Sequence, residues 1–372
     1  MKIIVFGGAG DVGSRTVEDL VDASGVDHVT IADHNVAAAD KLAASLRGRG
    51  APVDVKVVDA NDHEALVEAM QGYDVAASTL GPFYRFETRL VKAAIEAGVD
   101  YASICDEWAA AQTVLTEFDQ PARKAGRVII TGLGTSPGLS NICARYLAQQ
   151  MDRARRVDVS VYQPLNAGGG EAVLKHMLHI ITGEVAVWRE GRQVMVPACS
   201  EERLVEFPQF GRIRLWNMGH SEPVTVPRFV PGLEECSFFM GFGRGASLFI
   251  WPARRGMFAS DSRIDRTARL LAPVERLTGG QQPAPGALRV DVWGEKGGVR
   301  VHRMVCGIGQ MREATAICLS AGTQMLARKD LTVKEGGAYA PEACFEPEAF
   351  MAAMRAQGIE AYEDLAMSKP LA

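Results

Sequence analysis

A glycine-rich segment near the N-terminus carries the strongest chemical signal in the sequence. It reads GGAGDVG from Gly7 to Gly13 and directly follows the apolar residues Ile3–Phe6. The spacing fits G-x-G-x-x-G, in which the first glycine permits a tight turn, the second lets the backbone approach a pyrophosphate, and the third lets a helix pack closely on a strand. The pyrophosphate would lie at the positively polarised N-terminus of that helix. We expect a dinucleotide here, held by Gly8, Gly10, Asp11, Val12 and Gly13.

A carboxylate at the end of the second expected strand indicates which dinucleotide binds. Asp33 lies twenty positions after Gly13, where an acid accepts hydrogen bonds from the hydroxyls of the adenine-side ribose. The same charge would repel a 2′-phosphate, and the next residues, His34 and Asn35, include no arginine. We therefore expect NAD, with NADP as second choice. The alternative is that Asp33 only caps a turn.

Two further segments follow expected strands and would lie at the carboxyl edge of a parallel sheet, where such folds bind ligands. Gly81 and Pro82 come after the fourth strand and would bring backbone against the nicotinamide-side ribose, unless they only form a sharp turn. Asp59 follows the third strand. We count all three among the cofactor-binding residues.

Acid–base chemistry needs a group that can hold or release a proton beside the substrate. Asp106 ends the fifth expected strand and is a candidate for binding an amine or orienting a water molecule. His176 and His179 share one face of an expected helix, but no third ligand lies nearby, so we expect no metal site. We take Asp106 and His176 as the candidate catalytic residues, although a helical histidine is more often structural. Lys175, His179, His220 and Glu222 are alternatives of the same kind.

The elements that must position these residues alternate regularly over residues 1–134, and such alternation predicts a doubly wound parallel sheet, a Rossmann domain. We expect strands at Lys2–Phe6, Val29–Ala32, Val53–Val58, Tyr73–Ser78, Tyr101–Ile104 and Arg127–Ile130, and helices at Gly13–Ala23, Val36–Arg47, Asp62–Met70, Thr88–Ala97 and Trp108–Ala125.

The pattern changes after Thr131, where strands follow one another without helices between them. This predicts a second α+β domain with a mostly antiparallel sheet. The expected strands are Val157–Tyr162, Val185–Arg189, Gln193–Val196, Ile213–Trp216 and Leu288–Trp293; helices are expected near Ala172–Ile181, Asp265–Leu277, Thr315–Leu326 and Glu346–Gln357, with a loop from Gly336 to Pro341.

Composition limits the partners. The 372 residues are 47% hydrophobic and 23% charged, with a net charge of −5, so we expect no nucleic acid and no anionic membrane as partner. No apolar stretch approaches the roughly 20 residues of a membrane span. The seven cysteines are scattered and form no C-x-x-C pair, which favours reduced thiols in a cytoplasmic protein.

Taken together, these features resemble the saccharopine dehydrogenase-like family, in the branch of saccharopine reductase and lysine 6-dehydrogenase. The matching landmarks include the glycine segment, the Gly81–Phe83 turn, the stretch Ala97–Asp106 and the segment Gly134–Asn141 with its P-G-L-S-N sequence. Ala186–Gly191 resembles that family's arginine–glycine hairpin.

The resemblance implies a Rossmann domain over residues 1–134, a substrate and dimerisation domain over 135–312, and a C-terminal segment 313–372 that returns to the first domain. It also implies an NAD(P)-dependent dehydrogenase that transfers hydride at a C–N bond of an amino-acid, opine or polyamine-like substrate. A homodimer is implied as well.

Two rival classes fit part of the pattern. Gly7, Gly10 and Gly13 also match G-x-x-G-x-x-G, as in extended short-chain reductases and in redox sensors that bind the nucleotide without turnover. A carbonyl reductase of that type would need a Tyr-x-x-x-Lys pair, which the sequence lacks. A non-catalytic NAD(H) sensor remains the main alternative.

Overall fold

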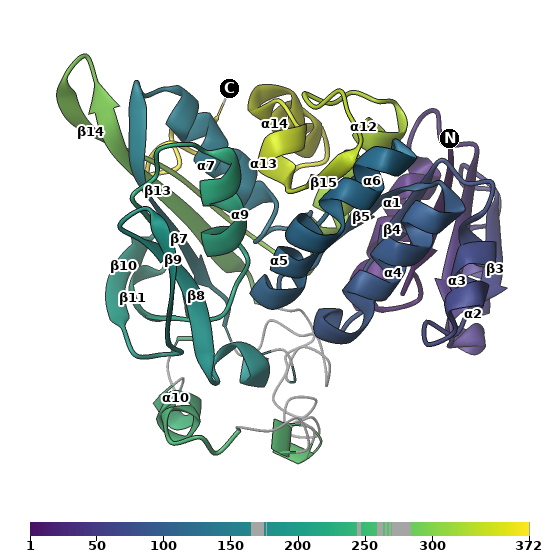
Figure 1. Ribbon diagram of the computed structural model, residues 1–372, viewed down its shortest axis with the longest axis horizontal. Coiled ribbons are helices and arrows are strands. Elements are labelled where there is room, and N and C mark those ends of the chain that lie inside the picture. Colours follow the sequence, from purple (N-terminus) through teal and green to yellow (C-terminus); the bar gives the residue numbers. More distant parts are fainter. Residues whose placement is uncertain are drawn as a thin grey trace. The chain divides into compact units, whose positions relative to one another are not determined.

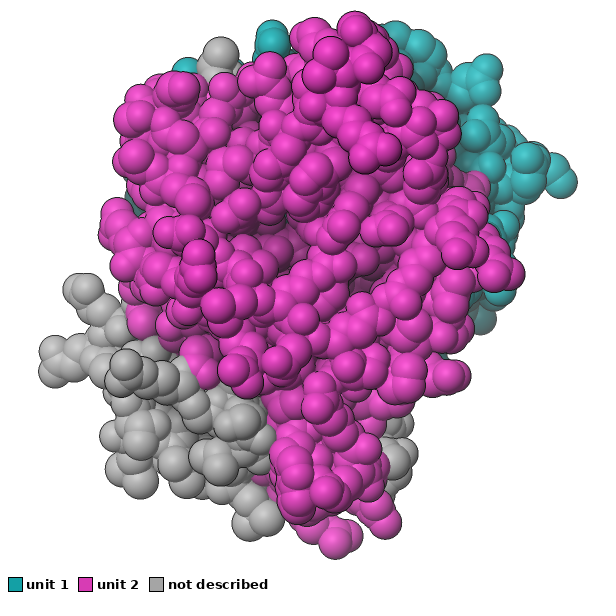
Figure 2. All heavy atoms as spheres, turned by 90° about the vertical axis from the view of Figure 1, so that its left-hand side faces the viewer, with its two compact units in different colours: residues 1–142, 312–357 teal, residues 143–311, 358–372 magenta. Residues whose placement is uncertain are grey.

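The chain passes from one folded unit to a second and back, as the computed structural model shows. Unit 1 comprises Met1–Ile142 and Arg312–Gln357, and unit 2 comprises Cys143–Met311 and Gly358–Ala372 (Figure 2). These bounds differ from the predicted ones at 134 and 312, and the last residues group with unit 2. The structure describes residues 1–164, 175, 177–243, 247–258, 263–264, 266–267, 269 and 284–371.

Unit 1 is built on a seven-stranded, entirely parallel sheet in the order β15-β6-β5-β4-β1-β2-β3. The strand order reverses between β1 and β4, which is the point where doubly wound sheets bind their ligands. The expected Rossmann architecture is confirmed. The strands are β1 (Lys2–Phe6), β2 (His28–Asp33), β3 (Val53–Val57), β4 (Val75–Ser78), β5 (Asp100–Ser103), β6 (Val128–Ile130) and β15 (Gly337–Tyr339).

Strand β15 corrects the expected loop at Gly336–Pro341. It pairs in parallel with β6 and extends the sheet by one strand contributed from the far end of the sequence. Three residues starting with glycine are too short a run to show strand periodicity, so only the partner strand reveals the element.

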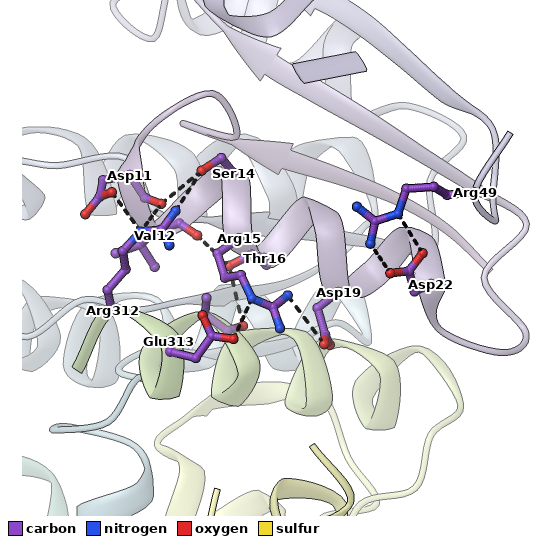
Figure 3. Close-up of polar contacts among 11 residues, drawn as sticks. Asp11, Val12, Ser14, Arg15, Thr16, Asp19, Asp22, Arg49, Arg312 and Glu313 are labelled. Carbon is purple, nitrogen blue, oxygen red and sulfur yellow. Dashed lines mark hydrogen bonds and ion pairs between the residues drawn. The ribbon is translucent and has the colours of Figure 1, made fainter. Parts of the chain in front are cut away.

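The helices of unit 1 flank this sheet. Helices α3, α4, α5 and α6 lie on the face turned toward the viewer in Figure 1, while α1 packs beside α12 (Figure 3). The boundary between the units falls within α7. The bounds are α1 (Asp11–Asp22), α2 (Val36–Leu46), α3 (His63–Met70), α4 (Phe83–Ala97), α5 (Trp108–Glu117), α6 (Asp119–Ala125), α7 (Leu139–Gln149), α12 (Met311–Ala327), α13 (Pro341–Cys344) and α14 (Pro347–Ala356).

The structure divides one predicted helix and gives others an earlier start, as for α12, which begins at Met311 rather than Thr315. The single helix expected from Trp108 to Ala125 is interrupted at Phe118, because the missing backbone N–H of Pro121 cannot continue the hydrogen bonds of α5. Helix α4 begins at Phe83 rather than Thr88. Its first turn is stabilised by the distant Glu107 carboxylate, which accepts the backbone N–H of Tyr84 at 2.7 Å.

Unit 2 holds an eight-stranded, mostly antiparallel sheet in the order β10-β11-β12-β7-β13-β14, with β8 pairing with β12 and β9. Among the described strands of this sheet, only β12 and β7 pair in parallel. The described elements are β7 (Arg153–Tyr162), β8 (Glu184–Arg189), β9 (Arg192–Pro197), β10 (Glu202–Phe207), β11 (Gly211–Asn217), β12 (Glu235–Gly241), β13 (Gly286–Lys296), β14 (Val299–Gly309), α9 (Glu222–Phe229) and α10 (Ser247–Arg254).

The expected α+β class of unit 2 is confirmed, and so is the hairpin expected near Ala186–Gly191, which joins β8 to β9. Strand β7 shows the alternation of a strand: the apolar Val157 and Val159 point to one face of the sheet and the polar Asp158 and Ser160 to the other, and all four are buried. No described helix is long and apolar enough to cross a membrane.

Candidate cofactor site

The glycine segment forms a tight loop between β1 and α1. Gly7 adopts φ +71°, and its carbonyl oxygen accepts the Gly10 N–H at 2.9 Å. A Cβ atom at Gly13 would lie 2.1 Å from the Gly7 oxygen, and one at Gly8 would lie 2.8 Å from the Val5 oxygen. Both positions therefore require glycine, because backbone atoms occupy the space that a side chain would take. The loop therefore has the close packing of helix on strand that the G-x-G-x-x-G pattern predicts.

Asp33, the last residue of β2, is tied to this loop. One carboxylate oxygen accepts the Ala9 N–H at 3.1 Å, and the other accepts the Asn35 N–H at 2.9 Å. His34 Nδ1 also lies 3.3 Å from the oxygen that holds Asn35. A carboxylate has about four acceptor positions, so the one left for a ribose hydroxyl is on the oxygen that holds Ala9. Asp33 thus holds both the turn after β2, through Asn35, and the glycine loop, through Ala9. A contact between Asp33 and the cofactor stays a prediction. These features fit a bound dinucleotide.

The turn after β4 is anchored to the same loop. The Thr79 hydroxyl donates to the Gly7 carbonyl oxygen at 3.0 Å, and the Leu80 N–H donates to the Ser78 hydroxyl at 3.2 Å. Gly81 and Pro82 are exposed, and nothing lies within 4 Å of a Cβ placed on Gly81. The space beside Gly81 is open to a ligand, so its predicted role is compatible with the geometry.

Asp106 lies in the loop after β5 and is half-buried. Its neighbour Cys105 is fully buried, and this burial raises the pKa of the thiol well above its ordinary value, with the nearby Glu87, Asp106 and Glu107 carboxylates adding to the effect. Cys105 is therefore a protonated, inert thiol near neutral pH. Asp106 is the group in this loop that stays a candidate for proton transfer.

Asp59 has a local task. It is exposed, and its Oδ1 accepts both the backbone N–H and the side-chain amide of Asn61 at 2.8 Å. These hydrogen bonds, the backbone one first, lower the pKa of Asp59. The carboxylate thus stabilises the turn before α3, and a contact with the cofactor stays a prediction.

The segment after β6 is held by its own hydrogen bonds. The Asn141 side-chain oxygen accepts the Gly138 N–H at 2.9 Å, and its amide donates to Glu342 at 2.9 Å. The Gly134 N–H donates to the Pro137 carbonyl oxygen at 2.8 Å. Together with the loops after β1, β2, β4 and β5, this segment lies at the carboxyl edge of one sheet, so the fold gathers the predicted residues of unit 1 there.

An arginine that sequence reasoning missed reaches the first turn of α1. The Arg312 Nε atom donates to the Asp11 backbone oxygen at 2.9 Å and to its carboxylate at 2.7 Å, and Nη2 donates to the Ser14 hydroxyl at 3.2 Å (Figure 3). The Asp11 charge, close to the expected pyrophosphate, is thereby balanced by a cation. No sequence signal links two residues three hundred positions apart.

Only some of the candidate acid–base residues of unit 2 belong to the part of the chain that the structure describes. His176 lies outside the described residues, so its role stays a prediction. His220 and Glu222 form a buried pair, with Nδ1 and Oε2 2.5 Å apart, and the His220 ring stacks on Phe238 at a centroid distance of 3.9 Å. Among the described residues, no group of three or more histidine, cysteine or acidic side chains could hold a metal ion.

Comparison with known proteins identifies relatives of this arrangement. Residues 3–130 match the family model described as saccharopine dehydrogenase NADP binding domain. Carboxynorspermidine synthase of Vibrio cholerae is 25% identical over 261 residues, which are 63% of this chain and 62% of that protein. Carboxyaminopropylagmatine dehydrogenase of Synechocystis sp. is 23% identical over 265 residues, 65% of this chain and 63% of that protein. The alignments thus span less than two thirds of either relative.

A solved structure extends the likeness of the fold to the full chain. Saccharopine dehydrogenase (L-Glu forming) from Saccharomyces cerevisiae, in its apo form, matches with a TM-score of 0.68 and 15% identity, covering 100% of both chains. The fold class and the family resemblance expected from the sequence are therefore confirmed.

Proposed function

We propose that this chain, whose first unit carries a saccharopine dehydrogenase NADP binding domain, is an NAD(P)-dependent oxidoreductase acting at a carbon–nitrogen bond. The observation that carries the proposal is the glycine loop with the Asp33 carboxylate bound to its Ala9 N–H. The substrate class comes from the relatives, whose names denote carboxylated polyamine-like compounds. We propose an amino-acid, opine or polyamine-like amine for this chain.

NAD is the proposed cofactor, and NADP is the second choice. The Asp33 carboxylate would repel a 2′-phosphate at the end of β2, whereas its remaining acceptor position suits a ribose hydroxyl. The glycine loop would hold the pyrophosphate through backbone N–H groups at the start of α1. When bound, the nicotinamide supplies the hydride acceptor or donor.

The chain's own groups would position the amine and handle protons. Asp106, at the carboxyl edge beyond β5, is proposed to accept a proton from the amine or to orient the water that opens an imine. His176 is the second proposed base. The remainder of the site would hold donor and acceptor together and exclude water.

The proposed enzyme works as a cytoplasmic homodimer. The seven cysteines are scattered along the sequence, form no C-x-x-C pair and are buried, which supports a reducing compartment. The dimer is carried over from the family resemblance and would be checked by sedimentation of the purified chain.

Nucleotide binding tests the proposal first. The purified chain would be titrated with NAD, NADH, NADP and NADPH, and the best oxidised form would be screened at 340 nm with amino acids, opines and polyamines. We expect NADH to bind most tightly and one amine class to be oxidised. Tight NADH binding with no turnover on any amine would favour the sensor function instead, and no binding at all would refute the proposal.

A further inference from the structure

A buried acid that the proposed chemistry does not use lies inside unit 1. Glu87, on α4, has no exposed surface. Its Oε1 accepts hydrogen bonds from the Ser103 hydroxyl at 2.5 Å and the Thr131 hydroxyl at 2.9 Å, and its Oε2 accepts one from the Tyr101 hydroxyl at 2.9 Å. All three donors are neutral hydroxyl groups.

The donors place this acid beneath the carboxyl edge of the sheet. Ser103 is the last residue of β5, and Thr131 directly follows β6. Glu87 therefore joins the ends of two neighbouring strands to α4, the helix that follows the Gly81–Pro82 turn.

Hydrogen bonds continue from these residues into the two loops above them. The Ser103 hydroxyl accepts the Cys105 N–H at 3.4 Å, and the Ser103 carbonyl oxygen accepts the Leu133 N–H at 2.6 Å. The loops 104–107 and 132–138 thus start from atoms whose positions depend on Glu87. Because the strand order reverses between β1 and β4, a dinucleotide lying across that point would put its adenylate half over β1 and β2 and its nicotinamide half over β4, β5 and β6.

An acid is a costly choice for packing alone. Its neighbours on the buried face of α4 are Phe83, Leu90, Val91 and Ala94, and an apolar side chain at position 87 would continue that face without a desolvation cost. Burial raises the pKa of Glu87, and the hydrogen bonds from Ser103, Tyr101 and Thr131 oppose that rise. A carboxyl group at this position has a function if it fixes the positions of the three hydroxyl groups that donate to it.

We propose that Glu87 is a positioning residue that sets the loops after β5 and β6 as the nicotinamide half of the cofactor site, leaving the adenylate half independent of it. The inference rests on the proposed function, because it takes the carboxyl edge as the dinucleotide site. It predicts that loss of the Glu87 carboxylate weakens the binding of the nicotinamide half of the cofactor and leaves the binding of the adenylate half unchanged.

The test compares Glu87→Gln with Asp100→Asn, using ADP as probe of the adenylate half and NADH as probe of both halves. Asp100 is a matched control, because it is a buried acid at the opposite end of β5 that accepts the Val128 N–H at 2.9 Å and pairs with Lys329. Glutamine keeps the size of the side chain and one acceptor oxygen, but its amide nitrogen can only donate, so at least one of the three hydroxyls loses its acceptor and must turn.

For Glu87→Gln we expect the dissociation constant of ADP to stay within about twofold of the parent, while that of NADH rises about tenfold, which corresponds to about 1.4 kcal/mol. Asp100→Asn should leave the ratio of the two constants unchanged. The inference would be overturned if the ratio of the NADH to the ADP dissociation constant were the same in Glu87→Gln as in the parent, or if the variant lost ADP and NADH binding together. If Glu87→Gln does not fold, Ser103→Ala and Thr131→Val carry the same expectation.

Amide hydrogen exchange in the protein without nucleotide separates this inference from the proposed function. Glu87→Gln should exchange faster than the parent in segments 104–107 and 132–138 and equally in Gly7–Gly13. Absence of NADH binding in the parent chain would refute the proposed function, whereas unchanged exchange in the two loops would refute the positioning role whatever the chain binds.

Discussion

Gly13 fixes the distance between α1 and the end of β1. The hydrogen atom in place of a side chain leaves room for the Gly7 carbonyl oxygen, which would be 2.1 Å from any Cβ. Since the obstacle is backbone and not a flexible side chain, it cannot move aside without displacing the loop. Stability and nucleotide binding are therefore linked at this residue.

Replacing Gly13 with alanine should destabilise the chain by about 3 kcal/mol and abolish NADH binding, because overpacking against backbone shifts the loop. Denaturant unfolding and NADH fluorescence titration would measure the two effects. Gly309→Ala is a matched control, since nothing lies within 4 Å of a Cβ there. A Gly13→Ala protein that binds NADH like the parent would contradict the assignment of the loop.

Asp33 combines a structural and a selective task. Asp33→Ser removes the charge that would repel a 2′-phosphate and the acceptors for the ribose hydroxyls. We expect the preference for NADH over NADPH to fall about tenfold or more, which is about 1.4 kcal/mol. Dissociation constants of both nucleotides would show this, with Asp40→Ser as a control at an exposed acid of α2. An unchanged preference would exclude Asp33 as the determinant of cofactor choice.

At the scale of elements, α12 supports the cofactor helix from the far end of the sequence. Arg15 of α1 donates to Glu313 of α12 at 2.6 Å, and Thr16 donates to the Ala316 backbone oxygen at 3.4 Å (Figure 3). Asp19, one turn further along α1, is buried at this contact, and burial raises its pKa. The contact between α1 and α12 therefore contains a carboxyl group, that of Asp19, whose protonation depends on folding.

The raised pKa of Asp19 predicts a pH-dependent stability. The folded state binds this proton more tightly than the unfolded state, so the contribution is fully present below the unfolded pKa, near 3.8, and is lost as the pH rises through the folded pKa. Asp19→Asn should lack that loss and be at least as stable as the parent at pH 7. Urea unfolding from pH 4 to pH 7 would measure it, with Asp22→Asn as the exposed control. A variant less stable at pH 7 than at pH 4, relative to the parent, would contradict this.

At the scale of the whole molecule, burial protects the cysteines. All seven are buried. Desolvation raises the pKa of Cys143 and of Cys199 to about 12 and that of Cys306 to about 11. Thiolates, the reactive species, are therefore scarce at neutral pH.

Native protein at pH 8 should accordingly release less than one equivalent of thionitrobenzoate from Ellman's reagent in the time that the denatured chain releases seven. The denatured sample serves as the control for the total. A single rapidly reacting thiol in the native protein would show that one of these sites opens more readily than its burial indicates.

Local patterns in the sequence were sufficient for much of unit 1. Alternating strands and helices, the glycine spacing and the position of Asp33 depend on neighbours within about twenty residues, so periodicity and turn chemistry reveal them. The family resemblance rested on such landmarks, and residues 3–130 match the expected domain.

Other features depend on contacts between residues far apart in the chain. The start of α4 needs Glu107, the edge strand β15 needs β6, and the balance of charge at Asp11 needs Arg312. Glu87 left one local trace, an acid on the apolar face of a helix, but its meaning came from three hydroxyls on neighbouring strands. Hydrogen bonds and packing across the fold carry no periodicity along the sequence, which is why folding in three dimensions had to supply them.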